Sequence, residues 1–213
     1  MANTDYLPAM GRHWLLPLYD TFSWLARVGR VHEQLLDRAG LQNGQRVLEI
    51  GCGTGNLLRA LGRRKLEVDA TGIDPDPAAL RLARRKAARA KLPIRYEQAF
   101  AGALPAPDEA FDRVLSSFML HHLPDGERQQ ALREVRRVLH PGGQLHVVDV
   151  DVTGSSKAHR NAQVAESTAE RMLTELTEAK FTKIEETGRV TGHFGVFAFY
   201  EASAPSGQKE DLA

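Results

Sequence analysis

The chain has 213 residues, with 28 lysines and arginines against 27 aspartates and glutamates, and a single cysteine. This length favours one domain whose hydrophobic core is large enough to be stable without disulfides or bound metal ions. The near-neutral charge argues against a DNA partner, and a single cysteine excludes an internal disulfide. We expect a soluble, cytoplasmic protein, because no segment has the pattern of a signal peptide or the ~18 apolar residues of a membrane span.

The chain before the first strand predicts one amphipathic helix. Apolar side chains recur at helical spacing over about residues 20–39, and Gly40 follows them. Glycine commonly ends a helix because it takes a left-handed conformation without strain. We therefore expect this helix to stop at Gly40.

Short apolar runs then alternate with runs that have one apolar face. This alternation indicates βαβ units and a parallel sheet. In chain order we expect a strand at 46–50, a helix through Leu57, Leu58 and Leu61, a strand at 68–73, a helix at 77–91, strands at 94–98 and 112–116, a helix at 126–139, a turn at 140–143 and a strand at 144–150.

The pattern changes after residue 151. A polar stretch leads into a predicted helix at about 163–179, and strands are predicted at 183–187 and 196–200. Without a helix between them, these two strands can pair as an antiparallel hairpin. The polar tail from Ser203 to the end contains Pro and Gly, and we expect it to be disordered.

A glycine-rich turn is the strongest chemical signal. Gly51, Gly53 and Gly55 lie between a predicted strand and a predicted helix, where open α/β sheets bind ligands. Their spacing departs from the G-x-G-x-x-G fingerprint of NAD sites, since position 56 is Asn. Asp74 ends the second strand, where a carboxylate can accept both hydroxyls of a ribose. Capping of the next helix is its other possible role.

Five motifs occur in order: EIGCGTG at 49–55, GIDP at 72–75, FDRVLS at 111–116, LHHL at 120–123 and LHPGG at 139–143. They resemble the successive motifs of class I S-adenosylmethionine-dependent methyltransferases, most of all the ubiquinone/menaquinone-biosynthesis-like, type 11 group. The resemblance covers residues 44–150 well and 151–202 loosely. It implies a Rossmann-like α/β domain over residues 44–202, with a mostly parallel seven-stranded sheet and an antiparallel final strand.

The resemblance also implies a cofactor, S-adenosyl-L-methionine, and a small-molecule methyl acceptor. It places the methionine part at the glycine turn, the ribose at Asp74, the adenine after the third strand and methyl transfer after the fourth. We expect Cys52 to be a small apolar filler of the turn rather than a nucleophile. The cofactor contacts implied are Glu49, Gly51, Cys52, Gly53, Gly55, Asn56, Asp74, Pro75, Phe100, Ala101, Ser116 and Tyr19.

Residues 1–43 lie in the position of the family's lid and are expected to be an N-terminal helical lid of the same domain. Trp14 and Tyr19 are the aromatic residues expected to close over the cofactor, and ordinary core packing is the alternative. Because this segment is rich in Trp, Tyr, Phe and Leu, we expect an apolar or aromatic acceptor.

Phe100 departs from the family's pattern. The family often has an acidic residue in a Q-x-D-A-x-x-L-P run, and here Phe100 occupies the acidic position. The usual acceptor for the adenine amino group is therefore missing. Phe100 can instead stack on or pack against the base, and the Ala101 backbone N–H can meet the ring.

His121 and His122 are the candidates for a general base, since histidine titrates near neutral pH. Adjacent residues at a helix start should not face the same way, so one of the two should be packed or solvated. The pair is a weak metal signal, because two helical ligands usually lie four residues apart, and we expect no metal.

The helix at 77–91 is strongly basic. Its default interpretation is a solvated outer helix, and binding to RNA or an anionic membrane surface is the lesser alternative. Its basic residues are Arg81, Arg84, Arg85, Lys86, Arg89 and Lys91.

The sequence therefore predicts an S-adenosylmethionine-dependent methyltransferase. Two other functions remain open at this point. Phe100 favours a non-catalytic protein that only binds the cofactor. An NAD-dependent oxidoreductase is the weaker alternative, because the spacing of the glycines and the lack of a Tyr-x-x-x-Lys motif count against it. The methyl acceptor and the oligomeric state do not follow from the sequence.

Overall fold

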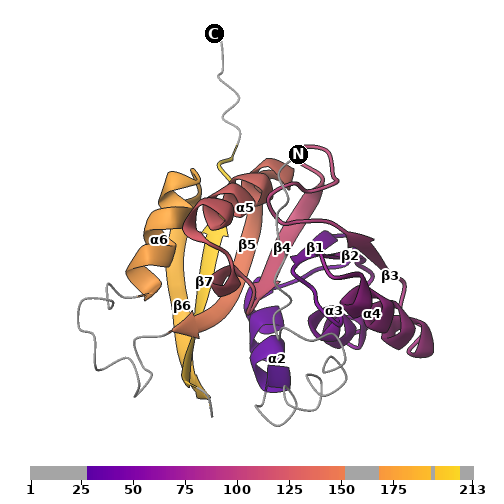
Figure 1. Ribbon diagram of the computed structural model, residues 1–213. Helices are drawn as coiled ribbons and strands as arrows, with labels where there is room; N and C mark the ends of the chain where they lie inside the picture. The colour runs from indigo at the N-terminus through magenta and orange to yellow at the C-terminus, as the bar shows by residue number, and fades with distance from the viewer. Residues whose placement is uncertain (1–27, 152–167, 193–194, 207–213) are drawn as a thin grey trace.

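The computed structural model describes residues 28–151, 168–192 and 195–206. These residues form one sheet with helices on both of its faces (Figure 1). The elements in chain order are α2 (Val28–Ala39), β1 (Arg46–Ile50), α3 (Asn56–Gly62), β2 (Asp69–Asp74), α4 (Pro77–Arg89), β3 (Ile94–Gln98), β4 (Phe111–Ser117), the short 3-10 helix η2 (Leu120–His122), α5 (Asp125–Val138), β5 (Leu139–Asp151), α6 (Thr168–Glu178), β6 (Thr182–Gly192) and β7 (Gly195–Ser203).

The sheet has seven strands in the order β3-β2-β1-β4-β5-β7-β6 within the described ranges. Strands β1 to β5 are parallel, and β7 runs antiparallel to both β5 and β6. This confirms the predicted mostly parallel sheet and its terminal hairpin. The strand order reverses between β1 and β4, and ligands bind open α/β sheets at the carboxyl ends of the strands beside such a reversal.

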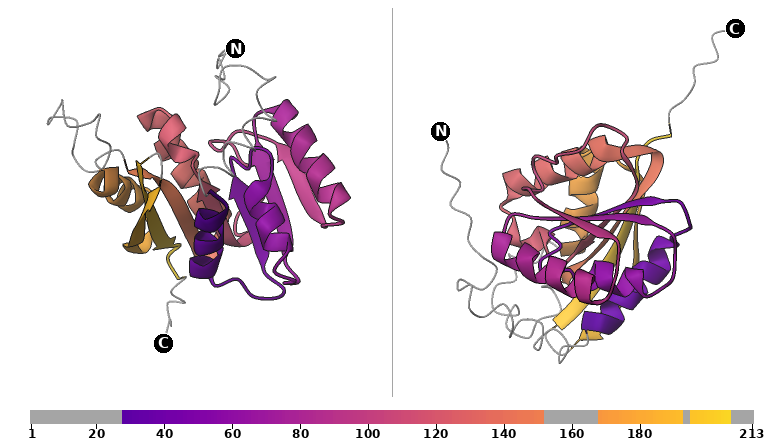
Figure 2. Two further views of the ribbon diagram at one scale, coloured as in Figure 1. Left: turned by 90° about the horizontal axis from the view of Figure 1, so that it is seen from below. Right: turned by 90° about the vertical axis from the view of Figure 1, so that its right-hand side faces the viewer.

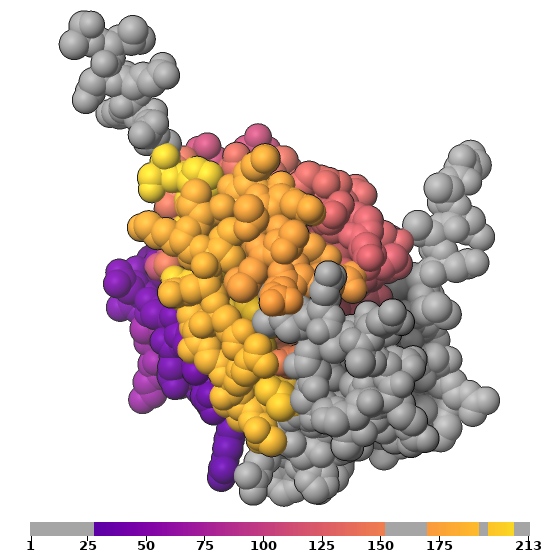
Figure 3. All heavy atoms as spheres, turned by 90° about the vertical axis from the view of Figure 1, so that its left-hand side faces the viewer, coloured from indigo at the N-terminus to yellow at the C-terminus, as the bar shows by residue number. Residues whose placement is uncertain are grey.

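Two apolar clusters pack against the two faces of the sheet. The views in Figure 2 show the helices that cover these faces. One cluster joins Leu48 and Ile50 of β1 to α5 and α6. The other joins Val47 of the same strand to α2, α3 and α4. Successive side chains of a strand point to opposite faces, so one apolar strand supplies both layers. Figure 3 looks onto the side where α6 lies beside α5 and the β6–β7 hairpin.

Helix α2 belongs to the core. Leu35 and Leu36 are each 1% exposed and pack in the cluster that contains Val47. Gly40 has a φ of +53°, which confirms the predicted glycine stop. Residues 28–39, predicted as part of a lid, thus fill the space against the sheet, because their apolar stripe needs a buried partner. The earlier part of that lid and of the helix predicted from residue 20, including Trp14 and Tyr19, lies outside the described residues.

Helix α4 buries Leu80 and three of its alanines, and most of its basic side chains are exposed. Arg81, Arg85 and Arg89 are exposed, which agrees with a solvated outer face. Two of the basic residues have specific partners. Arg84 donates to the Tyr96 carbonyl (2.6 Å), and Lys86 donates to the side chains of Thr54 (2.9 Å) and Asn56 (3.2 Å).

The turn predicted at residues 140–143 is wrong. Strand β5 already begins at Leu139, with a register irregularity opposite Phe111. Gly142, with a φ of +78°, marks the bend, and the segment stays extended because Gly142 and Gly143 exchange backbone hydrogen bonds with Ala204 (3.2 and 2.8 Å). A Pro–Gly–Gly sequence breaks a helix, but it can also form a bulged strand end.

The same contacts correct the predicted end of the domain. Ser203 belongs to β7 and Ala204 is 1% exposed, so the packed chain extends beyond residue 202. β6 also extends to Gly192, past the predicted end at 187, because it pairs with β7 up to that residue. β7 ends three residues past its predicted end at 200, and residues 163–167 of the helix predicted at 163–179 lie outside the described residues. The remaining described boundaries of the helices and of β1 to β4 differ from the predicted ones by at most two residues. Within the described ranges, no helix has the length and apolarity that crossing a membrane requires.

Candidate cofactor and methyl-transfer site

The glycine turn leaves β1 and enters α3 at the carboxyl edge of the sheet. Gly51, Gly53 and Gly55 have φ values of +65°, +50° and +75°, which glycine adopts without strain. A Cβ on Gly51 would overlap the side chain of Met119, and one on Gly55 would meet the Tyr96 hydroxyl. A Cβ on Gly53 would point into open space. The turn is therefore packed on both sides and open in the middle.

Asp74 at the end of β2 is bonded to this turn. Its Oδ2 accepts the Gly53 N–H (2.8 Å), and its Oδ1 accepts the Asp76 N–H (2.8 Å). Burial raises the pKa of the Asp74 carboxyl, and the two backbone donors oppose that rise. Each oxygen keeps acceptor capacity. The capping role considered for Asp74 belongs to Asp76, whose Oδ1 accepts the Ala78 N–H of α4 (2.7 Å).

Glu49 is a second buried carboxyl beside the turn. It is 3% exposed, and its Oε2 has no hydrogen-bond partner within the part of the chain that the structure describes. Burial first and Asp74 second raise the pKa of Glu49 well above its ordinary value, because both disfavour a negative charge. A buried carboxyl with an unused oxygen fits a positively charged ligand group.

The other residues predicted near the turn have mainly local partners. Cys52 is 5% exposed and burial raises the pKa of its thiol, so it fills space in the turn as expected. Asn56 begins α3 and accepts from Lys86. The Pro75 carbonyl accepts from Gln98 (3.1 Å), which joins the ends of β2 and β3.

The loop after β3 lies beside Asp74. The Ala99 N–H donates to the Asp74 carbonyl (3.3 Å), which brings residues 99–101 to the end of β2. Phe100 is 51% exposed, which is unusual for so large an apolar side chain, while Ala101 packs against the core. An exposed aromatic ring at this edge offers a flat surface to a planar ligand.

The loop after β4 forms the remaining wall. Ser116 is fully buried near the end of β4, and its hydroxyl has no partner within the described residues. Ser117 bonds the ring of His32 (3.0 Å), which brings α2 to this edge. Phe118 has a φ of +54°, a conformation rare in non-glycine residues that recurs at functional sites.

The two histidines of η2 lie together, against expectation. Their ring centroids are 3.9 Å apart and their ring planes are tilted by 43° within the short 3-10 helix. His121 pairs through Nδ1 with Asp149 of β5. Partial desolvation and then His121 lower the pKa of His122.

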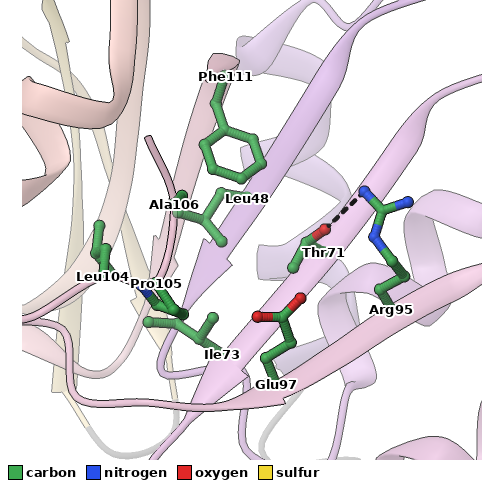
Figure 4. A pocket seen from close by; sticks show the side chains of 9 residues that line it. All are labelled: Leu48, Thr71, Ile73, Arg95, Glu97, Leu104, Pro105, Ala106 and Phe111. Carbon is green, nitrogen blue, oxygen red and sulfur yellow. Dashed lines mark hydrogen bonds between the residues drawn. The ribbon is translucent and has the colours of Figure 1, made fainter. Parts of the chain in front are cut away.

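A hollow of about 100 Å³ lies elsewhere, against β2 and β3 beneath the loop that leads to β4 (Figure 4). Arg95 at its edge donates to the Thr71 hydroxyl (3.3 Å). None of the predicted cofactor residues lines this hollow, and its volume is well below that of typical small-molecule sites. Its lining is Leu48, Thr71, Ile73, Arg95, Glu97, Leu104, Pro105, Ala106 and Phe111.

Sequence reasoning missed three residues of this site. Asp149 is hidden in the apolar run of β5, Asp76 follows the more conspicuous Asp74, and Met119 looks like an ordinary core residue. The available signal was the strand predicted at 144–150, which places Asp149 near the carboxyl end of that strand. Tyr19 is the one predicted contact outside the described residues. The other predicted residues come from β1, β2 and β4 and the loops that follow β1 to β4.

The chain resembles known methyltransferases in sequence and in fold. Residues 47–143 match the family described as a methyltransferase domain. The demethylmenaquinone methyltransferase of Thermus thermophilus is 38% identical over 138 residues, which are 63% of this chain and 62% of that protein. This chain therefore matches less than two thirds of that relative's length.

Two solved structures share the fold. A methyltransferase from Aquifex aeolicus, described as dependent on S-adenosylmethionine, superposes with a TM-score of 0.70 at 20% identity, over 91% of this chain and 98% of its own. The cyclase SpnF also gives 0.70, at 24% identity over 84% and 81%. The domain match over residues 47–143 and the shared fold make the chain similar to the class I S-adenosylmethionine-dependent methyltransferases.

Proposed function

We propose that this protein transfers a methyl group from S-adenosylmethionine to a small, apolar or aromatic acceptor. The observation that carries the proposal is the bond from the Gly53 N–H to Asp74 (2.8 Å), which joins the open glycine turn after β1, beside the switch point of the sheet, to a carboxylate at the carboxyl end of β2. The Thermus relative acts on demethylmenaquinone, a quinone, which supports an aromatic acceptor.

The residues present fit this cofactor. Its methionine part carries a cationic ammonium beside the sulfonium, and Glu49 offers a buried oxygen without a partner in the described ranges. Asp74 keeps acceptor capacity for ribose hydroxyls. We assign the methionine part to Glu49 and the glycine turn from Gly51 to Asn56, and the ribose to Asp74 and Pro75.

The adenine is assigned to the loop after β3. Phe100 supplies an apolar face, and the Ala101 backbone supplies a polar group. The acidic partner that the family often offers the adenine amino group is absent, so this contact relies more on stacking than on hydrogen bonding. Ser116 lies at the end of β4, between the cofactor turn and the loop that carries the histidines.

The residues of the chain must orient the acceptor and exclude water from the site. The bound cofactor supplies an electrophilic methyl group on sulfur. The protein must hold the acceptor atom in line with that methyl, and such positioning lowers a barrier by up to about 7–11 kcal/mol in favourable cases. We assign Tyr19 and Trp14 to the closing of the site, together with His121 and His122 next to the acceptor.

The test combines binding with turnover. Calorimetry should show S-adenosylmethionine and S-adenosylhomocysteine binding, and no binding of NAD. A screen with labelled cofactor over phenols, quinols, amines, thiols and lipids should then give a methylated product. NAD binding without binding of the methionine cofactor would contradict the proposal.

A second candidate is a protein that holds the cofactor without transferring its methyl group. Its support is the fold similarity to a cyclase, which shows that this fold also serves other reactions, together with Phe100 at the adenine position. Cofactor binding with no methylated product from any acceptor class would favour it.

A further inference from the structure

His121 and Asp149 are tied together by two contacts at the carboxyl edge of the sheet. Nδ1 of His121 bonds Oδ1 of Asp149, and Oδ2 accepts the backbone N–H of His121 (3.0 Å). Asp149 also accepts the Val150 N–H (2.8 Å) and is 3% exposed. One buried carboxylate therefore fixes both the backbone and the ring of His121.

This arrangement decides the tautomer of the ring. A carboxylate only accepts hydrogen bonds, so Nδ1 carries the proton and Nε2 keeps its lone pair in the neutral ring. Nε2 makes no hydrogen bond within the described part of the chain, and the His121 side chain is 31% exposed. The ring thus offers a basic nitrogen to a molecule in the site.

The histidine loop also touches the cofactor turn. Met119 lies two residues before His121 and occupies the space that a Cβ on Gly51 would need. Turn and loop are therefore in direct contact. The turn and the histidine loop thus lie at the same edge of the sheet, where β1, β4 and β5 end.

We infer that the acceptor is a hydroxyl compound that is un-ionised at working pH, a phenol or an enol, and that His121 takes its proton while Asp149 acts as the positioning residue. The inference rests on the proposed function and goes further by naming the acceptor class and the base. Thioethers and tertiary amines attack through a lone pair and have no proton to lose, so their methylation would not need the His121–Asp149 pair as a base.

The step balances as follows. The acceptor oxygen forms a bond to the methyl carbon while the carbon–sulfur bond breaks, and the electron pair of that bond stays on sulfur. The O–H proton moves to Nε2 of His121. The products are a methyl ether, a neutral thioether and an imidazolium paired with the Asp149 carboxylate. The partly exposed ring then returns the proton to water.

The kinetic test compares two acceptors in the full-length protein. The probes are 2-naphthol, which is un-ionised at the assay pH, and 4-nitrophenol, which is mostly ionised at mildly alkaline pH. His121→Asn should lower kcat for 2-naphthol about 100-fold or more, the range of general-base catalysis, and should lower kcat for 4-nitrophenol far less. Asp149→Asn should reproduce this difference between acceptors.

A second measurement does not depend on turnover. Nitrogen-detected NMR of the ring should show the Nδ1–H tautomer of His121 in the unmodified protein. In Asp149→Asn the amide oxygen can serve the backbone N–H only by turning its NH₂ group toward Nδ1, which favours the Nε2–H tautomer. That form has no lone pair at Nε2, so the loss of activity and the change of tautomer should occur together.

The chain contains a matched control. Asp112 pairs with His140 (3.0 Å) at the opposite end of β4 and accepts the Arg46 N–H. Asp112→Asn alters the same kind of pair far from the site and should leave kcat for both phenols and the tautomer of His121 unchanged. Calorimetry with S-adenosylhomocysteine and thermal unfolding should show that each variant is folded.

The outcomes separate the inference from the proposed function. An equal loss of kcat on both phenols, or an Nε2–H tautomer in the unmodified protein, overturns the inference. Methylation of amines or thiols with no reaction of any phenol also overturns it and leaves methyl transfer intact. Cofactor binding with no methylated product of any kind contradicts the proposed function itself.

Discussion

Gly51 and Gly53 both have positive φ, but they differ in what surrounds them. Alanine at Gly51 would strain the backbone and overlap Met119, whereas alanine at Gly53 would strain the backbone alone. A left-handed conformation costs a non-glycine residue about 1–2 kcal/mol, and overpacking adds about 1–3 kcal/mol. We predict that Gly51→Ala lowers the free energy of unfolding clearly more than Gly53→Ala, as measured by urea denaturation.

Met119→Ala is the control for that difference. It removes the Cγ that lies nearest to the added methyl, so the double variant should recover part of the stability lost by Gly51→Ala. Gly53→Ala should instead weaken cofactor binding, because its methyl points into the open middle of the turn. Equal destabilisation by the two alanines would show that the packing against Met119 is not tight.

The carboxyls of Glu49 and Asp74 predict proton release on cofactor binding. Burial raises the pKa of both groups, so in the unliganded protein they hold protons to a higher pH than usual. This raised pKa contributes stability at low pH, which is lost as the pH rises through the folded-state value. A cationic ligand favours the ionised carboxyls, so its affinity should increase with pH over the same window.

Calorimetry in two buffers of different ionisation enthalpy measures those protons. S-Adenosylmethionine should release protons at mildly acidic pH, and S-adenosylhomocysteine, which lacks the sulfonium charge, should release fewer. Glu49→Gln should reduce the release because it removes one titrating group. A binding enthalpy that is the same in both buffers would refute this coupling.

At the scale of single residues, the sequence allowed the turn and Asp74 to be predicted and did not reveal Asp149. The three glycines and Asp74 stand out because their chemistry does not suit an apolar strand. Asp149 lies in a run whose other side chains fill the core, and its role depends on β5 pairing next to β4, a long-range contact. The tilted contact between the rings of His121 and His122 likewise depends on side-chain torsions.

At the scale of elements, Asp74 and Asp76 divide two roles between them. Asp74 bonds the glycine turn, and Asp76 caps α4. Asp74→Ala should weaken cofactor binding by about 1–3 kcal/mol, the range for loss of a charged hydrogen-bonding partner. Asp76→Ala should lower the free energy of unfolding by about 0.5–2 kcal/mol, as removal of an N-cap does, with a smaller effect on the cofactor.

Binding calorimetry and thermal unfolding, run on both variants, resolve the two roles. If Asp74→Ala binds S-adenosylhomocysteine with unchanged affinity and remains folded, Asp74 has no part in the ribose site. If the free energy of unfolding of Asp76→Ala is unchanged, the hydrogen bond from the Ala78 N–H to Asp76 does not stabilise α4.

Element boundaries followed from the sequence wherever periodicity and capping residues agreed. The strand at 94–98 is observed as predicted, and α4 begins at Pro77, which follows its cap. The turn predicted at 140–143 failed because local turn chemistry was overridden by pairing with Ala204, which lies far along the chain. Gly142 still bends the backbone there, so the prediction of a bend is correct, but the bend lies within β5 and not in a turn before it.

At the scale of the whole molecule, the seven-stranded sheet with an antiparallel final strand followed from the family resemblance, and the order of its strands comes from the structure alone. Alternating strands and helices predict a parallel sheet, but they do not say that β1 lies between β2 and β4. The place of α2 was also misjudged. An amphipathic stripe indicates that one face is buried, and only the tertiary structure shows that this face meets the sheet.

The division between core and cover is testable by deletion. Among the described residues the packed core begins at Val31, and the aromatic residues assigned to the lid come before α2. Removal of residues 1–27 should therefore leave a folded domain with nearly unchanged thermal stability. Because Trp14 and Tyr19 would be lost, turnover with labelled cofactor should fall sharply.

The contrasting deletion removes residues 1–39 and with them α2. It takes away Leu35 and Leu36, each buried in the core, and truncating a single such leucine to alanine already costs about 2–5 kcal/mol. That loss approaches the whole stability of a typical domain, so this shorter chain should not fold, as circular dichroism would show. Full turnover and unchanged acceptor preference after removal of residues 1–27 would exclude that segment from the site. The N-terminal border of the site would then be α2, which the hydrogen bond between His32 and Ser117 joins to the end of β4.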